Sequence, residues 1–283
     1  MNPLKSLRRR YEDLSEPYRA LLRLRALTGG LSRSLLPECL RESDAPAPRG
    51  RTWNAVDIRG ALHALRGLGL LDERERVVPE LEHELAVEGL HDMAPAVRRV
   101  LRRGTGIHTA ALRMRLAAYE RDAGAFRRVR ADIAALEEGG ADPFAGQFTE
   151  APVPGRWIAS LPPPIALDIV ANNLLPLVEA GRFTPNLASC LEALPRLRPA
   201  LADLPPCPPL ILFDALAGRH TEARAQLVPF LVDRTEWPSH VRRLLHRGFC
   251  PHRRVGSVPV PRPGLLRHLP LAAQPRQGSP AHL

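Results

Sequence analysis

The sequence has almost no lysine. Lys5 is the only lysine among 40 basic residues, so the other 39 are arginines. A P-loop needs a lysine that reaches the phosphates, a protein kinase needs one on a strand, and a Schiff-base enzyme needs a buried one. Lys5 precedes every predicted element of the fold and fits none of these roles. With 30 prolines and plentiful alanine, leucine and glycine, the arginine content is typical of a GC-rich coding bias and is weak support for nucleic-acid binding.

Paired cysteines and long apolar runs are also missing. Cys39, Cys190, Cys207 and Cys250 are scattered and form no Cys-x-x-Cys pair, which argues against both a disulfide framework and a zinc ribbon. No stretch approaches the ~18 uncharged apolar residues that a membrane span needs. We therefore expect a soluble cytoplasmic protein that does not associate with membranes.

The common catalytic signatures are absent as well. His83-Glu84 resembles the start of a zincin motif, but Val87 stands where the second histidine must be. There is no Gly-x-Ser-x-Gly elbow, and Asp168, Asp203 and Asp214 fit solvated or capping roles better than catalytic ones. The sequence predicts no catalytic residue, no cofactor-binding residue and no small-molecule substrate. We expect a protein that is not an enzyme.

One cluster has metal-like spacing. His246, Cys250 and His252 lie close together, but the segment is compositionally biased and offers no fourth ligand. We interpret the cluster as chance and predict no metal site.

The stretch from Ser15 to Leu90 has the order of elements of a winged helix. Three predicted helices precede two short apolar runs, which a charged turn separates. The elements are a helix that ends at Gly29-Gly30, a helix over Ser32–Glu42, a helix from Asn54 to about Gly69, and the runs Leu70-Leu71 and Val77-Val78. The sequence therefore predicts a winged-helix-like domain over residues 1–90.

Two of these helices have clear apolar faces. In the third, Asn54 can cap the first turn, and Ile58, Leu62 and Leu65 lie on one side. In the first, a leucine-rich stripe is expected to be buried, while three arginines point elsewhere: Arg19, Arg23 and Arg25.

Helical patterns continue to about residue 245. Helices are predicted over 79–90 and 92–103, and similar glycine joints recur at Ala123–Phe126, Ala180–Phe183 and Ala217–His220. The last two glycines are 37 residues apart, slightly above the ~34 residues of a tetratricopeptide hairpin. Prolines interrupt the pattern, including Pro176 inside a predicted helix. Residues 91–245 are therefore predicted to form a degenerate tetratricopeptide-like α-helical repeat array.

The last 38 residues, 246–283, have a different composition. They carry six arginines, seven prolines and no acid, so residues 1–245 hold 34 bases against 30 acids, or +4 of the total +10. Such a segment cannot build a core. It is either a disordered basic tail that attracts nucleic acid or anionic membrane, or the product of a shifted reading frame.

The predicted third helix is also the place where DNA could bind. Its outward face should present Arg59, His63 and Arg66, with Asp57 nearby as an opposing charge. A major-groove reader usually offers more basic or amide side chains than this. A second polar feature, Asn172-Asn173, is expected on an exposed helix face, with a groove-lining role as the alternative.

Two blocks, Arg19–Arg41 and Ile58–Leu71, followed by helical repeats, resemble the N-terminal accessory region of some bacterial SWI/SNF-type helicase-like ATPases. The resemblance implies a mainly α chain without the two motor lobes, whose ATP-binding motifs do not occur here. We expect a non-catalytic protein-interaction scaffold, the accessory region of a truncated helicase-like ATPase, whose partner is a protein or the missing motor. The alternative is a winged-helix DNA-binding transcriptional regulator or a signalling adaptor.

Overall fold

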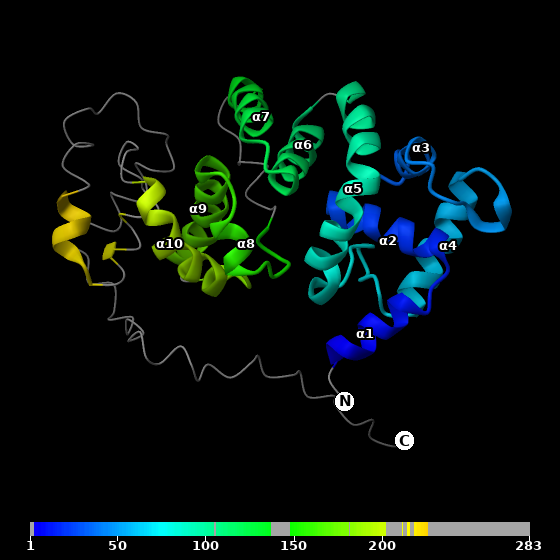
Figure 1. The fold of residues 1–283 in the computed structure, drawn as a ribbon, viewed down its shortest axis with the longest axis horizontal. Helices are drawn as coiled ribbons and strands as arrows, with labels where there is room; N and C mark the ends of the chain where they lie inside the picture. Colours follow the sequence, from blue (N-terminus) through cyan, green and yellow to red (C-terminus); the bar gives the residue numbers. More distant parts are fainter. Residues whose placement is uncertain are drawn as a thin grey trace, which may run out of the picture. The chain divides into compact units, whose positions relative to one another are not determined.

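The computed structural model describes residues 3–104, 106–136, 148–180, 182–201, 211, 214–215 and 218–225. The chain divides into two compact units, Met1–Pro209 and Leu210–Leu283, and each is considered by itself. The predicted mainly α class is confirmed, because helices dominate the described residues (Figure 1). The elements of the first unit are α1 (Pro3–Glu12), α2 (Glu16–Thr28), α3 (Leu36–Glu42), the short 3-10 helix η1 (Pro48–Gly50), α4 (Ala55–Gly67), α5 (Pro79–Arg103), α6 (Ile107–Glu120), α7 (Ala123–Leu136), α8 (Gly155–Ala159), α9 (Pro163–Ala180) and α10 (Leu187–Leu201).

Local sequence signals account for α4. The Asn54 side chain accepts hydrogen bonds from the amides of Val56 and Asp57, at 2.8 and 3.0 Å. This is the capping that the sequence predicted. The predicted apolar face is also confirmed, since Ile58, Leu62 and Leu65 are all buried. The opposite face of α4 remains exposed.

A tight turn follows α4. Leu71 and Val77 form an isolated antiparallel bridge, and the Asp72 amide donates to the Arg76 carbonyl at 2.9 Å. Glu75 adopts a positive φ of 61° in the turn. This bridge is the only β pairing in the described part of the chain.

The long helix α5 differs from the prediction. The sequence indicated two helices, over 79–90 and 92–103, but one 25-residue helix spans both. The predicted domain boundary at residue 90 therefore lies within a helix. Gly89 does not end the helix; it allows α2 to approach, because a Cβ at this position would lie 3.0 Å from the Arg23 Cβ. Packing against α2 thus stabilises a stretch that looked like a helix end.

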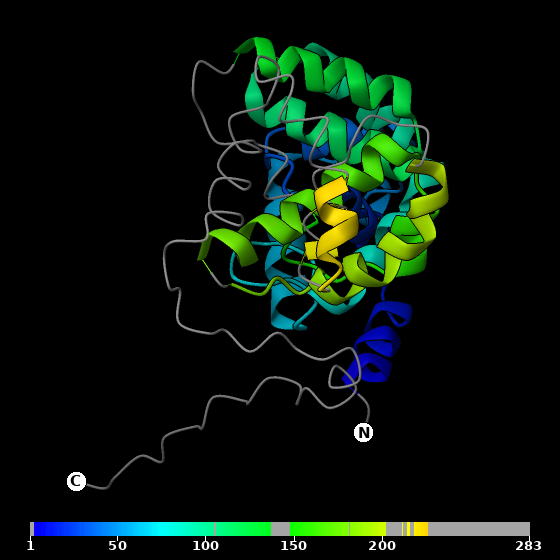
Figure 2. The same ribbon diagram turned by 90° about the vertical axis from the view of Figure 1, so that its left-hand side faces the viewer.

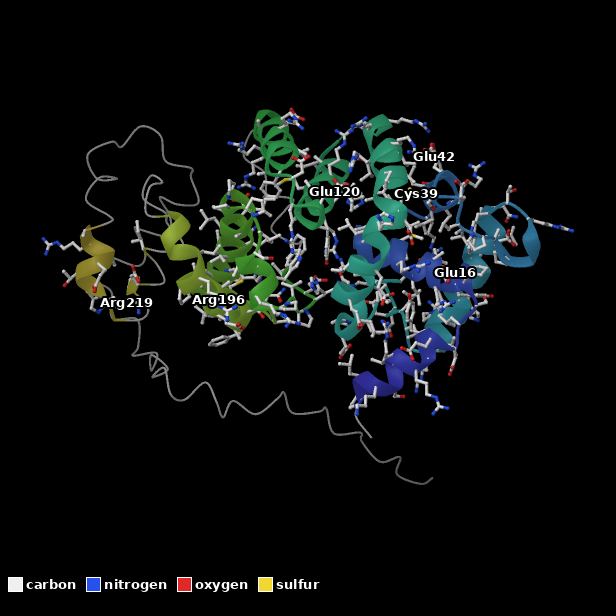
Figure 3. All side chains as sticks on the ribbon, viewed as in Figure 1. Glu16, Cys39, Glu42, Glu120, Arg196 and Arg219 are labelled. Carbon is white, nitrogen blue, oxygen red and sulfur yellow. The ribbon has the colours of Figure 1, made fainter. Side chains whose placement is uncertain are left out.

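Ion pairs attach the neighbours of α5 to its surface. Glu42, from α3, and Glu120, from α6, flank the helix (Figure 3). Arg99 Nε lies 2.6 Å from Glu42 Oε2, and Arg98 pairs with Glu120. Both ion pairs are exposed and link α3 and α6 to α5.

The glycine joints predicted between helices are not all found as turns. Between α6 and α7 the turn is made by Arg121, with φ of 57°, and by Asp122, whose carboxylate caps the Ala125 amide at 2.8 Å. Gly124 lies inside α7, so the joint predicted at Ala123–Phe126 was wrong by two residues. In the second unit Gly218 does make a turn, with φ of 77°. Gly181 lies outside the described residues.

Helices α5, α6 and α7 pack in succession, and both views show α6 beside α7 (Figures 1 and 2). Helices α8, α9 and α10 form a second packed group. Pro176 lies within α9 without ending it, contrary to the predicted interruption. Within the residues described, none of the helices combines the length and the apolar composition that crossing a bilayer requires.

Candidate functional site

The three residues predicted to contact nucleic acid lie along one exposed side of α4. Arg59, His63 and Arg66 are all exposed, and Arg66 Nη2 lies 3.5 Å from His63 Nδ1. Asp57 precedes Arg59 by two residues, a spacing that places it on the other side of the helix. In the described ranges neither Arg59 nor Arg66 pairs with a carboxylate. The acid that was expected to offset these arginines therefore does not neutralise them directly.

Two neighbouring positions of α4, Val56 and Gly60, are also exposed. Val56, at its start, is 73% exposed. A Cβ built on Gly60 meets no heavy atom within 4 Å. Packing within the fold therefore does not require glycine at position 60. Glycine destabilises a helix interior, and no described contact offsets that destabilisation.

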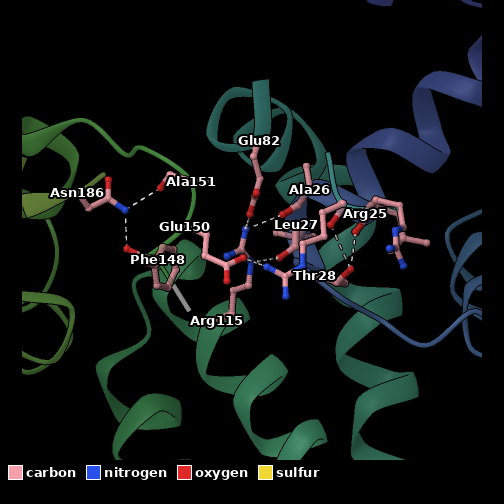
Figure 4. Close-up of polar contacts among 12 residues, drawn as sticks. Arg25, Ala26, Leu27, Thr28, Glu82, Arg115, Phe148, Glu150, Ala151 and Asn186 are labelled. Carbon is pink, nitrogen blue, oxygen red and sulfur yellow. Dashed lines mark hydrogen bonds and ion pairs between the residues drawn. The ribbon is translucent and has the colours of Figure 1, made fainter. Parts of the chain in front are cut away.

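A second polar centre was not predicted from the sequence. Arg115, on α6, is 4% exposed and donates from Nε to Leu27 O at 3.1 Å and from Nη2 to Ala26 O at 2.8 Å (Figure 4). Its Nη2 also lies 2.6 Å from Glu82 Oε1 of α5. The guanidinium thus satisfies the last carbonyls of α2, which have no partner within that helix. One side chain joins α2, α5 and α6.

Gly29 is needed for this contact. It ends α2 with φ of 65°, and a Cβ there would come within 2.8 Å of Arg115 Nε. Both the backbone conformation and the space favour glycine.

A second buried arginine acts in the same region. Arg25 was expected to point away from the core, but it is 5% exposed. It donates to Leu31 O and to Glu75 O, each at 2.8 Å, and burial lowers the pKa of its guanidinium. The prediction was wrong because the long side chain donates to two carbonyls that lie outside its own helix. Arg25 thereby fixes the turn after α4 to the end of α2.

Four rings gather beside Arg115. His83, Tyr119, Phe148 and Trp157 have neighbouring centroids between 4.9 and 5.9 Å apart. The Arg115 guanidinium carbon lies 5.0 Å from the Phe148 centroid and 5.4 Å from that of Tyr119, within cation–π range.

The electrostatics of this cluster favour uncharged rings. Burial, with the nearby positive charge of Arg115, lowers the pKa of His83 to about 4. Burial raises the pKa of Tyr119 to about 12. Efficient general acids and bases have pKa values near the working pH, and both groups are shifted away from it. The arrangement is suited to packing and orientation rather than to proton transfer.

A small polar cavity of about 40 Å³ lies next to these rings. Arg76, Glu82, His83, Arg115 and Glu150 contribute to its lining. The volume suffices for ordered water, which needs roughly 10–15 Å³ of such space. Arg76 and Glu150 form an ion pair at this cavity.

Residues 148–153, here called the strap, are held by two asparagines. Asn186 donates to Phe148 O and to Ala151 O, the latter at 2.7 Å, and accepts from the Val153 amide at 2.7 Å (Figure 4). Asn173 donates to Phe148 O at 3.2 Å. Asn173 is completely buried, so its predicted place on an exposed face was wrong. Asn186 was not singled out by the sequence, because a single asparagine in a loop carries no distinguishing pattern.

The remaining candidate residues have structural contacts or lie outside the described ranges. Cys39 and Cys190 are buried free thiols, and burial raises the pKa of each to about 12, which makes them poor nucleophiles. Asp168 lies 3.2 Å from Arg130, and Asp214 of the second unit pairs with Arg219 at 2.8 Å. Five residues named in the sequence analysis are not described, nor is any other part of the segment 246–283: Asp203, Cys207, His246, Cys250 and His252. Over the described ranges no three His, Cys, Asp or Glu side chains converge in a way that could hold a metal ion.

Comparison with known proteins gives no relative: no protein-family model, curated protein or solved structure matches the chain.

Proposed function

We propose that the chain is a non-catalytic protein-interaction scaffold, with a winged-helix-like N-terminal domain and a degenerate tetratricopeptide-like helical array. We propose further that its partner is the motor part of a SWI/SNF-type helicase-like ATPase. The order α2, α3, α4 and then the Leu71–Val77 bridge supports the winged-helix part. The helix pair α6–α7, joined by two residues, supports the array. The proposed partner comes from the resemblance of the two N-terminal blocks.

The observation that carries the scaffold proposal is the exposure of Phe183. At the α6–α7 pair the corresponding ring, Phe126, is 2% exposed and packed, whereas Phe183, between α9 and α10, is 67% exposed. It is the only aromatic ring among the large apolar side chains that are exposed in the described residues. Aromatic and arginine side chains dominate binding energy at protein interfaces, and Arg182 beside it is also exposed.

The loop that presents Phe183 is held in place. Thr184 Oγ1 donates to Asn173 Oδ1 at 2.6 Å, which ties the loop to α9 directly after the exposed ring. An anchor side chain on a loop that is already ordered loses less conformational freedom on binding. Phe183 is therefore positioned to enter a pocket of a protein partner.

Phe183→Ser tests this proposal. The full chain is titrated with the two-lobe motor fragment of a bacterial SWI/SNF-type ATPase in a calorimeter. We expect the wild-type chain to bind and Phe183→Ser to bind at least tenfold more weakly, a loss of about 1.4 kcal/mol or more. The unfolding temperature should not change, because the ring is exposed.

Val56→Ser is the matched control, since Val56 is an equally exposed apolar residue on α4. It should leave binding of the motor fragment unchanged. No heat with the wild-type chain, or equal binding by Phe183→Ser, would overturn the proposal.

A second candidate function is a winged-helix DNA-binding regulator. Two exposed arginines of α4, Arg59 and Arg66, pair with no carboxylate among the described residues and favour it. We expect that, with residues 246–283 deleted, the double variant Arg59→Ala/Arg66→Ala binds duplex DNA more weakly. The plot of the logarithm of the binding constant against the logarithm of the salt concentration has a negative slope. Its magnitude should decrease by about 0.9 for each removed arginine that contacts a phosphate. Gly60→Ala should weaken binding by blocking close approach, while stabilising the helix by roughly 0.5–1 kcal/mol.

Fluorescence anisotropy with a labelled duplex, over a range of salt concentrations, measures these effects. Arg127→Ala/Arg128→Ala removes two exposed arginines from α7 and serves as the charge-matched control. If both double variants lower affinity equally, or if binding disappears with residues 246–283 alone, α4 is not a DNA-reading helix.

A further inference from the structure

The strap contacts the rest of the protein in the way that a bound peptide contacts a receptor. Its backbone is recognised by side chains: the asparagines 173 and 186 satisfy two carbonyls and one amide of the segment. Contacts of this kind bind an extended chain independently of its side chains, as main-chain bonds do in other peptide sites. The two asparagines come from α9 and from the loop before α10, so the receptor part is separate from the strap in the sequence.

Two side chains of the strap show which residues the site would select in a bound segment. Phe148 is 3% exposed, with its ring 5.6 Å from both Tyr119 and Trp157 and its face toward the Arg115 guanidinium. Glu150, two residues later, pairs with Arg76. The surface that contacts the strap is here called the groove. It offers an aromatic pocket to Phe148 and a cationic contact to Glu150, at the spacing of Phe-x-Glu.

The strap is an imperfect occupant of this groove. Phe148 has φ of 59°, a left-handed conformation that costs a bulky residue roughly 1–2 kcal/mol. A polar cavity of about 40 Å³ lies between the strap, Arg115 and Glu82, so the strap does not pack against all of the groups around it. Strained non-glycine conformations persist only where the surrounding structure enforces them, and they cluster at binding and switch regions. A free peptide that relaxes this conformation would compete with the strap.

We propose that this groove is a docking site for an extended segment of a protein partner with the pattern Phe-x-Glu, and that the strap occupies it in the free protein. The proposal rests on the scaffold function, for which it names a partner motif and a second contact site besides Phe183. In the free protein Phe148 enters the aromatic pocket, Glu150 binds Arg76, and the two asparagines bind the strap backbone. The phenylalanine, glutamate and backbone of the partner segment would make the same contacts. Displacement of the strap by a partner segment would break the link between the turn after α4 and residues 148–153.

The experiment uses the full chain and a fluorescein-labelled hexapeptide, Phe-Thr-Glu-Ala-Pro-Val, with blocked ends. Anisotropy is measured with wild type, Glu150→Ala and Phe148→Gly. When the strap occupies the site, the apparent affinity for the peptide equals the intrinsic affinity multiplied by the fraction of molecules in which the site is open. We therefore expect Phe148→Gly to bind at least tenfold more tightly than wild type, with Glu150→Ala between them. A peptide with alanine in place of its phenylalanine should not bind, and one with glutamine in place of its glutamate should bind more weakly.

Circular dichroism establishes which variants fold. Glu150 is 58% exposed in its side chain, so Glu150→Ala should fold even if Phe148→Gly does not, and it then decides the question. Absence of peptide binding to every folded variant, or equal binding of the alanine peptide, overturns the inference. If the motor fragment still binds while the peptide does not, the scaffold proposal stands and only the docking groove is wrong.

Discussion

Arg115→Met is expected to lower the free energy of unfolding by about 3–5 kcal/mol, the cost of leaving one partner of a buried ion pair alone. Glu82 would lose its partner in a poorly solvated position, and the carbonyls of Ala26 and Leu27 would lose their donor. Methionine keeps much of the side-chain volume, so the loss reports on polarity rather than on a cavity. In a thermal scan this corresponds to a fall of roughly 10 °C for a unit of this size.

A double variant separates the ion pair from the rest of the contact. Arg115→Met/Glu82→Leu removes both charges and should be more stable than Arg115→Met, because no unpaired carboxylate remains. Arg127→Met, at an exposed position of α7, should stay within about 0.5 kcal/mol of wild type. A loss below 1 kcal/mol for Arg115→Met would mean that the arginine does not join the three helices.

Asn186→Ala is expected to cost about 2–4 kcal/mol, because it takes their partner from the Ala151 carbonyl and the Val153 amide and removes one of the two donors to the Phe148 carbonyl. Urea unfolding measures the loss, and hydrogen exchange locates it at the Val153 amide, which should lose its protection. Among the contacts of the described residues, the strap would keep those of Asn173 and of its own side chains.

Asn172→Ala is the control for this variant. Asn172 lies on α9 beside Asn173, and its Nδ2 is buried without a hydrogen-bond partner among the residues described. Removing an unsatisfied group costs little and can stabilise a protein. Equal losses for the two alanine variants would show that the Asn186 contacts are not what holds the strap.

The sequence predicted features that depend on neighbours within one turn of helix. The Asn54 cap and the apolar face of α4 are local, and both were found. The exposed positions of Arg59, His63 and Arg66 follow from the same periodicity. What binds to them is not local, and it remains a prediction.

Features that depend on distant residues were missed. A helical pattern predicts arginine side chains on the outside of a helix, but Arg115 reaches carbonyls 88 and 89 positions away. Asn186 acts on a segment at least 33 positions earlier. The predicted helix over 79–90 was expected to end where Gly89 instead lets α2 approach the continuous helix α5. In each case the deciding contact is tertiary, and periodicity in the sequence carries no information about it.

Hydrogen exchange of the full chain, with and without the two-lobe motor fragment, tests the scaffold claim most directly. We expect amides around residues 182–186 to gain protection when the fragment is present, while those of α4 are unchanged. Protection nowhere in the chain, or confined to α4, would contradict it.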